Sequence, residues 1–234
     1  MINVLLAGVG GQGTVLAAKV LAQAAQARGW QVRTAETIGM AQRGGNVTSH
    51  VRMGSEGEEV FSSLITPGTA DMVIALEPGE AARALPYLAP GGVLVTATTA
   101  IQPVTAALSD QSYTAAGVVA SLANALQAQA PAEARAARSA EALRPEAAEQ
   151  DAQASGVDGW PVPLFIPVND ADLVWEIGSG SRKSLNMMLL GIAVAQKRIP
   201  LTLDEVRQAM EVCIKPQFLS MNLIAFNHAT QGYM

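Results

Sequence analysis

Two glycine-rich segments within the first 50 residues constrain the fold of this chain more than any other feature. The first reads Gly8-Val9-Gly10-Gly11-Gln12-Gly13. It follows an apolar run at 1–7 that is too short for anything but a buried strand, and it precedes a proline-free stretch of helix formers at 14–28. Glycine allows positive φ and close approach, and a helix start offers free N–H groups to an anion. The segment is therefore a strand-to-helix turn of an α/β fold.

The spacing of Gly8, Gly10 and Gly13 fits the G-x-G-x-x-G pattern, in which a pyrophosphate lies at the helix N-terminus. Such sites also place an acidic residue about 20 residues further on, at the ribose hydroxyl. Glu36, which closes a strand predicted at 31–35, is the candidate. The same glycines could instead hold another anionic ligand or a partner's loop, or only close a tight turn. The pattern alone leaves these interpretations open.

The second segment, Gly39-Met40-Ala41-Gln42-Arg43-Gly44-Gly45, precedes a half-buried strand predicted at 47–53. Arg43 is the best anion contact in the chain, because a guanidinium gives a fork of donors while the glycines let a ligand approach. A role in bracing the loop is an equal alternative. His50 follows on the strand, where a hydrogen bond within the sheet is favoured over a role in a site.

The remaining pattern predicts a three-layer, Rossmann-like α/β fold, with a mostly parallel sheet and helices on both faces. Buried strands are expected at 71–76, 93–97 and 161–167, and a short helix at 79–88 is expected to end at Pro90-Gly91-Gly92. The last third is helical. One helix is expected at 184–197, where Leu185, Met188, Leu189 and Ile192 repeat on one face. A capping box begins another at Thr202, and the helix from Pro216 is too apolar for a free tail.

Length and composition favour one domain over 1–234, since half of the 234 residues are hydrophobic. An alanine-rich insertion is predicted at about 115–156, with a first part that packs and a charged second part that is peripheral. Gly191, inside the helix at 184–197, costs about 1 kcal/mol relative to alanine. This cost indicates a compensation there, such as close approach of another backbone.

Charge and cysteine content exclude several classes of function. A net charge of −5 without a Lys/Arg cluster argues against nucleic acid and anionic membrane surfaces. No apolar run is long enough to cross a bilayer and no basic leader begins the chain, so a cytoplasmic location is expected. The single cysteine, Cys213, is predicted to lie in the core, and it excludes an iron–sulfur cluster or a cysteine zinc site built by this chain alone.

The sequence supplies no recognisable catalytic set. His50 and His228 are the only histidines, and neither combines with Cys213 or a serine motif into a nucleophile and base. The motifs G-x-S-x-G and H-E-x-x-H do not occur. We therefore assign no catalytic residue and no metal ligand.

Three sets of residues resemble a known family. They are Gly8 to Gly13, Gly39 to Gly45 with Ser49-His50-Val51-Arg52, and Asn186 with Leu190-Gly191. Together they are similar to the gamma-type subunit of 2-oxoacid:ferredoxin oxidoreductases, and within it to the beta subunit of indolepyruvate oxidoreductase. The segment Met40-Ala41-Gln42-Arg43 makes the match specific to that branch. The resemblance covers roughly 1–97 and 161–232 but not the alanine-rich stretch.

The resemblance implies a small subunit that is inactive alone and binds no cofactor by itself. Its partner would be a large alpha subunit that holds thiamine diphosphate and iron–sulfur clusters, with coenzyme A as co-substrate and ferredoxin as electron acceptor. The pair would oxidatively decarboxylate an arylpyruvate. The glycine segments would face the partner's active site or help to hold a phosphate-bearing ligand such as coenzyme A. The candidate cofactor-binding residues are Gly8, Gly10, Gly11, Gln12, Gly13, Gln42, Arg43, Gly44, Gly45 and His50.

Two other functions remain open from the sequence. A self-sufficient Rossmann dehydrogenase would bind a nicotinamide nucleotide with Glu36 on the ribose. A regulatory module would sense a nucleotide without performing chemistry. The lack of a catalytic set weighs against the dehydrogenase but does not separate the subunit from the regulatory module.

Overall fold

The computed structural model describes residues 1–39, 45–102, 113–129, 163–178 and 182–233. In chain order the elements are β1 Ile2–Val9, α1 Thr14–Ala27, β2 Gln31–Ile38, β3 Asn46–Gly54, β4 Ala70–Ala75, α2 Pro78–Ala84, the 3-10 helix η1 Leu85–Tyr87, β5 Leu88–Ala97, α4 Ala115–Gln129, β6 Leu164–Val168, α6 Asp170–Glu176, the 3-10 helix η3 Arg182–Ser184, α7 Leu185–Ala195, α8 Leu203–Cys213 and α9 Pro216–Gln231. None of the helices in these ranges combines the length and apolarity needed to cross a bilayer.

The strands form one six-stranded sheet in the order β2-β3-β1-β4-β5-β6. The pairs β1/β4, β4/β5 and β5/β6 are parallel, whereas β3 is antiparallel to both β1 and β2. The expected α/β fold with a mostly parallel sheet is confirmed. The strand that runs against both of its neighbours, β3, is the one that leaves the second glycine segment.

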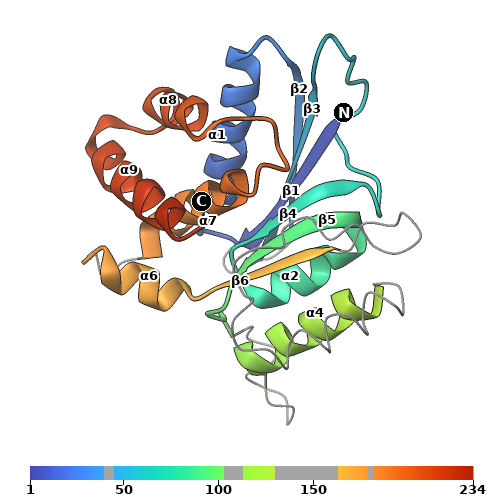
Figure 1. The fold of residues 1–234 in the computed structure, drawn as a ribbon, viewed down its shortest axis with the longest axis vertical. Helices are drawn as coiled ribbons and strands as arrows, with labels where there is room; N and C mark the ends of the chain where they lie inside the picture. The colour runs from blue at the N-terminus through green and yellow to red at the C-terminus, as the bar shows by residue number, and fades with distance from the viewer. Residues whose placement is uncertain (40–44, 103–112, 130–162, 179–181, 234) are drawn as a thin grey trace, which may run out of the picture.

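Helices cover both faces of the sheet (Figure 1). Alternation along β1 divides the core: Val4 and Leu6 belong to the cluster with α1, α7, α8 and α9, whereas Leu5 and Ala7 belong to the cluster with α2 and α4. The first part of the alanine-rich segment packs as predicted, because Leu122 and Leu126 of α4 are buried in the second cluster. The charged second part lies outside the described residues.

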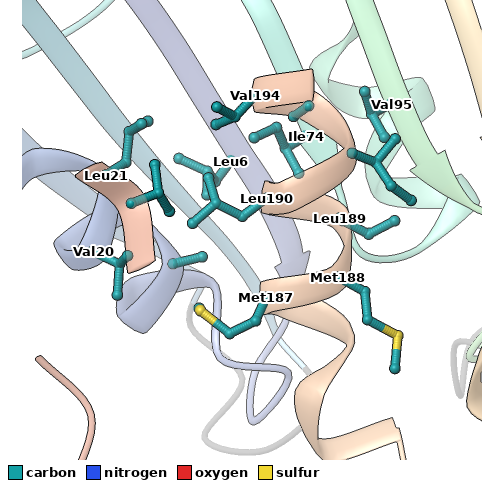
Figure 2. Close-up of a cluster of buried hydrophobic side chains, with 14 of the residues drawn as sticks. Leu6, Val20, Leu21, Ile74, Val95, Met187, Met188, Leu189, Leu190 and Val194 are labelled. Atoms are coloured by element: carbon teal, nitrogen blue, oxygen red, sulfur yellow. The ribbon is translucent and has the colours of Figure 1, made fainter. Parts of the chain in front are cut away.

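Helix α7 lies at the centre of the larger cluster. Leu6, Ile74 and Val95 of the sheet lie beside Leu189, Leu190 and Val194 of α7, with Val20 and Leu21 of α1 nearby (Figure 2). All eleven residues of α7 are buried. The predicted apolar face of Leu185, Met188, Leu189 and Ile192 is buried as expected, and the rest of α7 is buried too, because the helix lies between the sheet, α1 and α9.

A close approach at Gly191 is observed, although side chains of α9 make it rather than the other backbone that was expected. A Cβ atom there would lie 2.9 Å from Thr230 Cγ2 and 3.1 Å from the Phe226 ring, so α9 packs directly against the α7 backbone. The same contact holds the last helix on this chain. The capping box at Thr202 is also observed, since Glu205 N donates to Thr202 Oγ1 while Thr202 N donates to the Glu205 carboxylate.

One predicted boundary was wrong, and one helix was missed. Pro90, Gly91 and Gly92 do not end a helix but lie within β5, where the pairing with β4 shifts register between Ala70/Leu88 and Met72/Val93. Helix α6 was not predicted. Its N-terminus is capped by the Asn169 side chain, which accepts from Asp172 N, and only two of its seven residues are buried. A helix that is this short and this exposed has too few apolar residues to produce a periodic pattern in the sequence.

Candidate functional site

The first glycine segment forms the turn between β1 and α1, as predicted. Gly11 and Gly13 have φ values of +95° and +84°, a region that side-chain-bearing residues rarely adopt. Gly13 is the N-cap of α1, and no side chain caps the first turn. That turn also contains no acidic residue. The first N–H groups of a 14-residue helix are thus left for another acceptor, which favours an anion.

Gln12 braces this turn with both ends of its side chain. Its Oε1 accepts from Val9 N at 2.6 Å, and its Nε2 donates to Leu76 O at 3.0 Å, just beyond β4. The position of Gly8 depends on the same packing, since a Cβ there would lie 3.0 Å from Gln12 Oε1 and 2.7 Å from Thr14 Oγ1. Within the structure, Gln12 fixes the shape of the turn.

Asn186, at the start of α7, supports the turn from the C-terminal third of the chain. Its Nδ2 donates to Gly13 O at 3.1 Å. Asn186 is 2% exposed, and a Cβ on Gly13 would lie 2.5 Å from its Nδ2. Glycine is required at this position both for its conformation and for this contact.

In the part of the chain that the structure describes, a backbone hydrogen bond joins the two glycine segments. Gly10 N donates to Gly45 O at 2.8 Å, and Gly39 N donates to Asn46 O at 2.8 Å where the second segment begins and ends. The structure therefore brings Gly8, Gly10, Gly11, Gln12, Gly13 and Gly45 together. Gln42, Arg43 and Gly44 lie outside the described residues.

A pocket of about 470 Å³ lies over the first glycine turn. It is lined by Val9, Gly11, Gly13, Thr14, Val15, Leu16, Lys19 and Val47. Thr14 is 2% exposed, and its Oγ1 has no hydrogen-bond partner among the described residues. Lys19, in the second turn of α1, is exposed. An uncapped helix start, an unpaired hydroxyl and a lysine form a site suited to a phosphate group. The sequence analysis missed Thr14 and Lys19, the first and sixth residues of α1.

His50 is not part of this pocket. It lies on the α2 side of the sheet, in a second pocket of about 240 Å³ lined also by Glu80, Arg83 and Tyr87. Its Nδ1 accepts from Ile65 N at 3.2 Å, and its ring meets that of Tyr87 edge-on with centroids 5.8 Å apart. The hydrogen-bonding role favoured from the sequence is observed, but the bond joins the strand to a loop residue instead of lying within the sheet, and a role of His50 in cofactor binding stays a prediction. Burial lowers the pKa of His50, and burial raises the pKa of Glu80, which is paired with Arg83.

Glu36 does not hold the position that a dinucleotide site requires. It lies within β2 rather than at its end, it is exposed, and it pairs with Ser49 of β3. Because β3 separates β2 from β1, the second strand is at the sheet edge instead of beside the glycine turn. With this strand order Glu36 cannot reach a ribose bound at the glycine turn, so the dehydrogenase alternative is not favoured.

Cys213 was wrongly placed in the core. It ends α8, is only half-buried, and lines a pocket between α1 and α9. The apolar residues around Cys213 in the sequence suggested burial, but a residue at the end of a helix is more exposed than one in its middle. Among the described residues, no group of three or more His, Cys, Asp and Glu side chains could hold a metal ion.

Comparison with known proteins identifies the family. The pattern of the pyruvate ferredoxin/flavodoxin oxidoreductase family matches residues 3–232. The chain belongs to this family. It is 30% identical to the indolepyruvate oxidoreductase subunit IorB of Archaeoglobus fulgidus over 235 residues, which is 99% of this chain and 96% of that protein.

Two solved structures share the fold. One is the gamma subunit of a keto/oxoacid ferredoxin oxidoreductase from Geobacter sulfurreducens, with a TM-score of 0.58 and 17% identity over 99% of this chain and 97% of that one. The other is the 2-oxoglutarate:ferredoxin oxidoreductase from Magnetococcus marinus with 2-oxoglutarate, coenzyme A and succinyl-CoA bound. Its TM-score is 0.60 at 16% identity, over all of this chain and 31% of that one. The predicted resemblance, and with it a subunit of a 2-oxoacid oxidoreductase, is confirmed.

Proposed function

We propose that this chain is the small subunit of an indolepyruvate-type oxidoreductase. The reaction takes a 2-oxoacid, coenzyme A and oxidised ferredoxin to an acyl-CoA, carbon dioxide and reduced ferredoxin, with two electrons passing to ferredoxin. The observation that supports this most is the 30% identity to an indolepyruvate oxidoreductase subunit over nearly the whole of both chains. The resemblance in the second glycine segment supports the same branch.

The proposal assigns thiamine diphosphate and the iron–sulfur clusters to a larger partner subunit. The sequence contains one cysteine, whereas a cluster needs a set of Cys ligands, so this chain cannot hold one unaided. Several large apolar side chains are exposed on the described surface, among them Phe61 at 87%, Trp175 at 83% and Ile38 at 68%. Such residues support a partner interface. The cytoplasmic location and the single domain with an insertion at about 115–156 belong to the same proposal.

The site over the first glycine turn fits a phosphate group of coenzyme A. Thr14 Oγ1 supplies a buried hydroxyl without a partner, the start of α1 supplies uncapped N–H groups, and Lys19 supplies a positive charge. Gly11 and Gly13 keep the backbone accessible. In this proposal the chain binds and orients the co-substrate, and the chemical steps occur in the partner subunit.

The test uses the assembled complex and measures the KM for coenzyme A. We expect Thr14→Val and Lys19→Met each to raise this KM about tenfold with little change in kcat, because each removes a hydrogen bond to a charged group. Arg198→Met removes an exposed cation that lies outside the pocket and should leave the KM unchanged. If both pocket variants form an active complex with an unchanged KM for coenzyme A, then coenzyme A does not bind at this turn. The proposed subunit function would stand without that site.

A further inference from the structure

Two hydrogen bonds at the start of α7 determine the orientation of the Asn186 amide. Its Oδ1 accepts from Met187 N at 3.0 Å, and its Nδ2 donates to Gly13 O at 3.1 Å. The reversed amide would place a donor against Met187 N and an acceptor against Gly13 O, so only this orientation satisfies both groups. The side chain is buried in the core. Asn186 therefore presents a fixed donor to Gly13.

The carbonyl oxygen of Gly13 accepts two hydrogen bonds. One comes from Ala17 N at 3.1 Å and is the first bond of α1, and the other comes from Asn186. A carbonyl oxygen has two lone pairs, so both are used. Among the described residues, Asn186 is the only one whose side chain hydrogen-bonds the peptide between Gly13 and Thr14. The glycine N-cap has no side chain of its own that could hold this peptide.

The same peptide presents the first N–H group of α1 to the pocket over the glycine turn. The Gly13 carbonyl and the Thr14 N–H belong to one planar trans unit, so they point in opposite directions, and a hold on the oxygen also fixes the direction of the N–H. This N–H lies in the first turn, where N–H groups have no partner within the helix. Gly13 and Thr14 line the pocket, whereas Asn186 does not.

A hydrogen bond accepted by the Gly13 carbonyl also makes the Thr14 N–H a stronger donor. Hydrogen bonds in a chain polarise one another, by about 10–30% per bond. An anion gains most from this effect, because hydrogen bonds to a charged acceptor are roughly twice as strong as those between neutral groups. Asn186 thus affects an anion at the glycine turn in two ways, since it orients the Thr14 N–H and polarises it.

We propose that Asn186 is a positioning residue for the phosphate of coenzyme A. The inference rests on the proposed binding of coenzyme A at the glycine turn, and it adds a residue from the C-terminal third of the chain that does not touch the ligand. Asn186 holds the peptide between Gly13 and Thr14 so that Thr14 N–H donates to a phosphate oxygen. Its loss weakens coenzyme A binding and leaves the chemical step unchanged.

The test compares Asn186→Leu with Asn222→Leu in the assembled complex. Asn222 is the matched control, because it is also buried and its Nδ2 also donates to a backbone carbonyl, that of Phe218 at 2.8 Å, but it lies outside the pocket. Asn186→Leu should raise the KM for coenzyme A about fivefold, which is part of the effect of one hydrogen bond to a charged group. The kcat per active complex and the KM for the 2-oxoacid should change less than about twofold in both variants.

The selectivity of this change is the readout that a merely structural role would not produce. Both substitutions remove a buried hydrogen bond, so both are expected to lower stability, but only Asn186→Leu should raise the KM for coenzyme A. Asn186→Asp gives a second measure with less change in packing. It keeps the acceptor for Met187 N and replaces the donor to Gly13 O by a carboxylate oxygen. Its KM for coenzyme A should exceed that of Asn186→Leu, because the carboxylate and the phosphate also repel each other.

Two results would overturn this inference alone. In the first, Thr14→Val raises the KM for coenzyme A and neither Asn186 variant does, so the phosphate site stands without Asn186. In the second, the Asn186 variants raise the KM for the 2-oxoacid as much as that for coenzyme A, so the residue is structural. An unchanged KM for coenzyme A in Thr14→Val as well would remove the site and this inference together. A wild-type complex whose activity does not depend on coenzyme A would instead contradict the proposed function.

Discussion

The side-chain amide of Asn186 donates to the carbonyl oxygen of Gly13 at 3.1 Å, across 173 positions of sequence. This bond joins the start of α7 to the turn that begins α1. A buried helix from the C-terminal third thereby fixes the N-terminal glycine turn, where the phosphate site is proposed. The geometry of that site therefore depends on the packing of α7 in the core.

Gly13→Ala should destabilise the protein more than Gly11→Ala. Both glycines have positive φ, and this conformation costs an L-residue about 1–2 kcal/mol. Only at Gly13 would the new Cβ approach Asn186, since nothing lies within 4 Å of a Cβ at Gly11. We expect an additional loss of about 1–3 kcal/mol in the free energy of unfolding for Gly13→Ala, measured in urea. Equal losses would contradict the contact.

Gln12→Glu should lower the free energy of unfolding by about 1–3 kcal/mol at neutral pH. The change removes the donor to Leu76 O and places a carboxylate against that carbonyl oxygen. The matched control is Gln217→Glu, an exposed glutamine in the first turn of α9, which should change stability by less than about 0.5 kcal/mol. A Gln12→Glu variant as stable as the control would show that the bracing bonds do not matter.

Much of this arrangement could be predicted from the sequence, because local rules determine it. The turn at Gly8 to Gly13, the capping box at Thr202 and the close approach at Gly191 each follow from a short pattern with one physical cause. The position of Glu36 could not be predicted. It depends on β3 entering the sheet between β1 and β2, a choice that no local pattern records. The same limit applies to His50, since the helix over its side of the sheet is set by tertiary packing.

Gly191→Ala should be destabilising despite the gain in helix propensity of about 1 kcal/mol. The new methyl would lie 2.9 Å from Thr230 Cγ2 in a fully packed contact between α7 and α9. Overpacking of this kind costs about 1–3 kcal/mol. Thr230→Ser removes that methyl group, so the double variant should recover part of the loss in thermal unfolding. If the double variant were no more stable than Gly191→Ala, the contact with Thr230 Cγ2 would not be the cause of the loss.

Stability should fall as the pH is lowered through about 6.5, the usual His pKa, and His50 should account for part of the fall. Burial lowers the pKa of His50 in the folded state, and its Nδ1 must stay unprotonated to accept from Ile65 N. The unfolded chain therefore binds a proton that the folded chain does not, from about pH 6.5 down to the lowered folded pKa.

The measurement compares urea unfolding at pH 7.5 and pH 5.5 for the wild type and His50→Asn. Asparagine keeps an acceptor but cannot be protonated, so the variant should lose less stability between the two pH values. The comparison cancels the contributions of Glu80 and Arg83, which line the same pocket and are present in both proteins. Identical pH dependence in the two proteins would contradict the assignment to His50.

Affinity capture of the full chain from its native cells, followed by an assay of the captured complex, tests the central claim most directly. The account predicts a larger co-purifying subunit containing thiamine diphosphate and iron–sulfur clusters. It also predicts that the complex reduces ferredoxin with indolepyruvate only when coenzyme A is present. Recovery of the chain alone, or only with copies of itself and without this activity, would contradict the account.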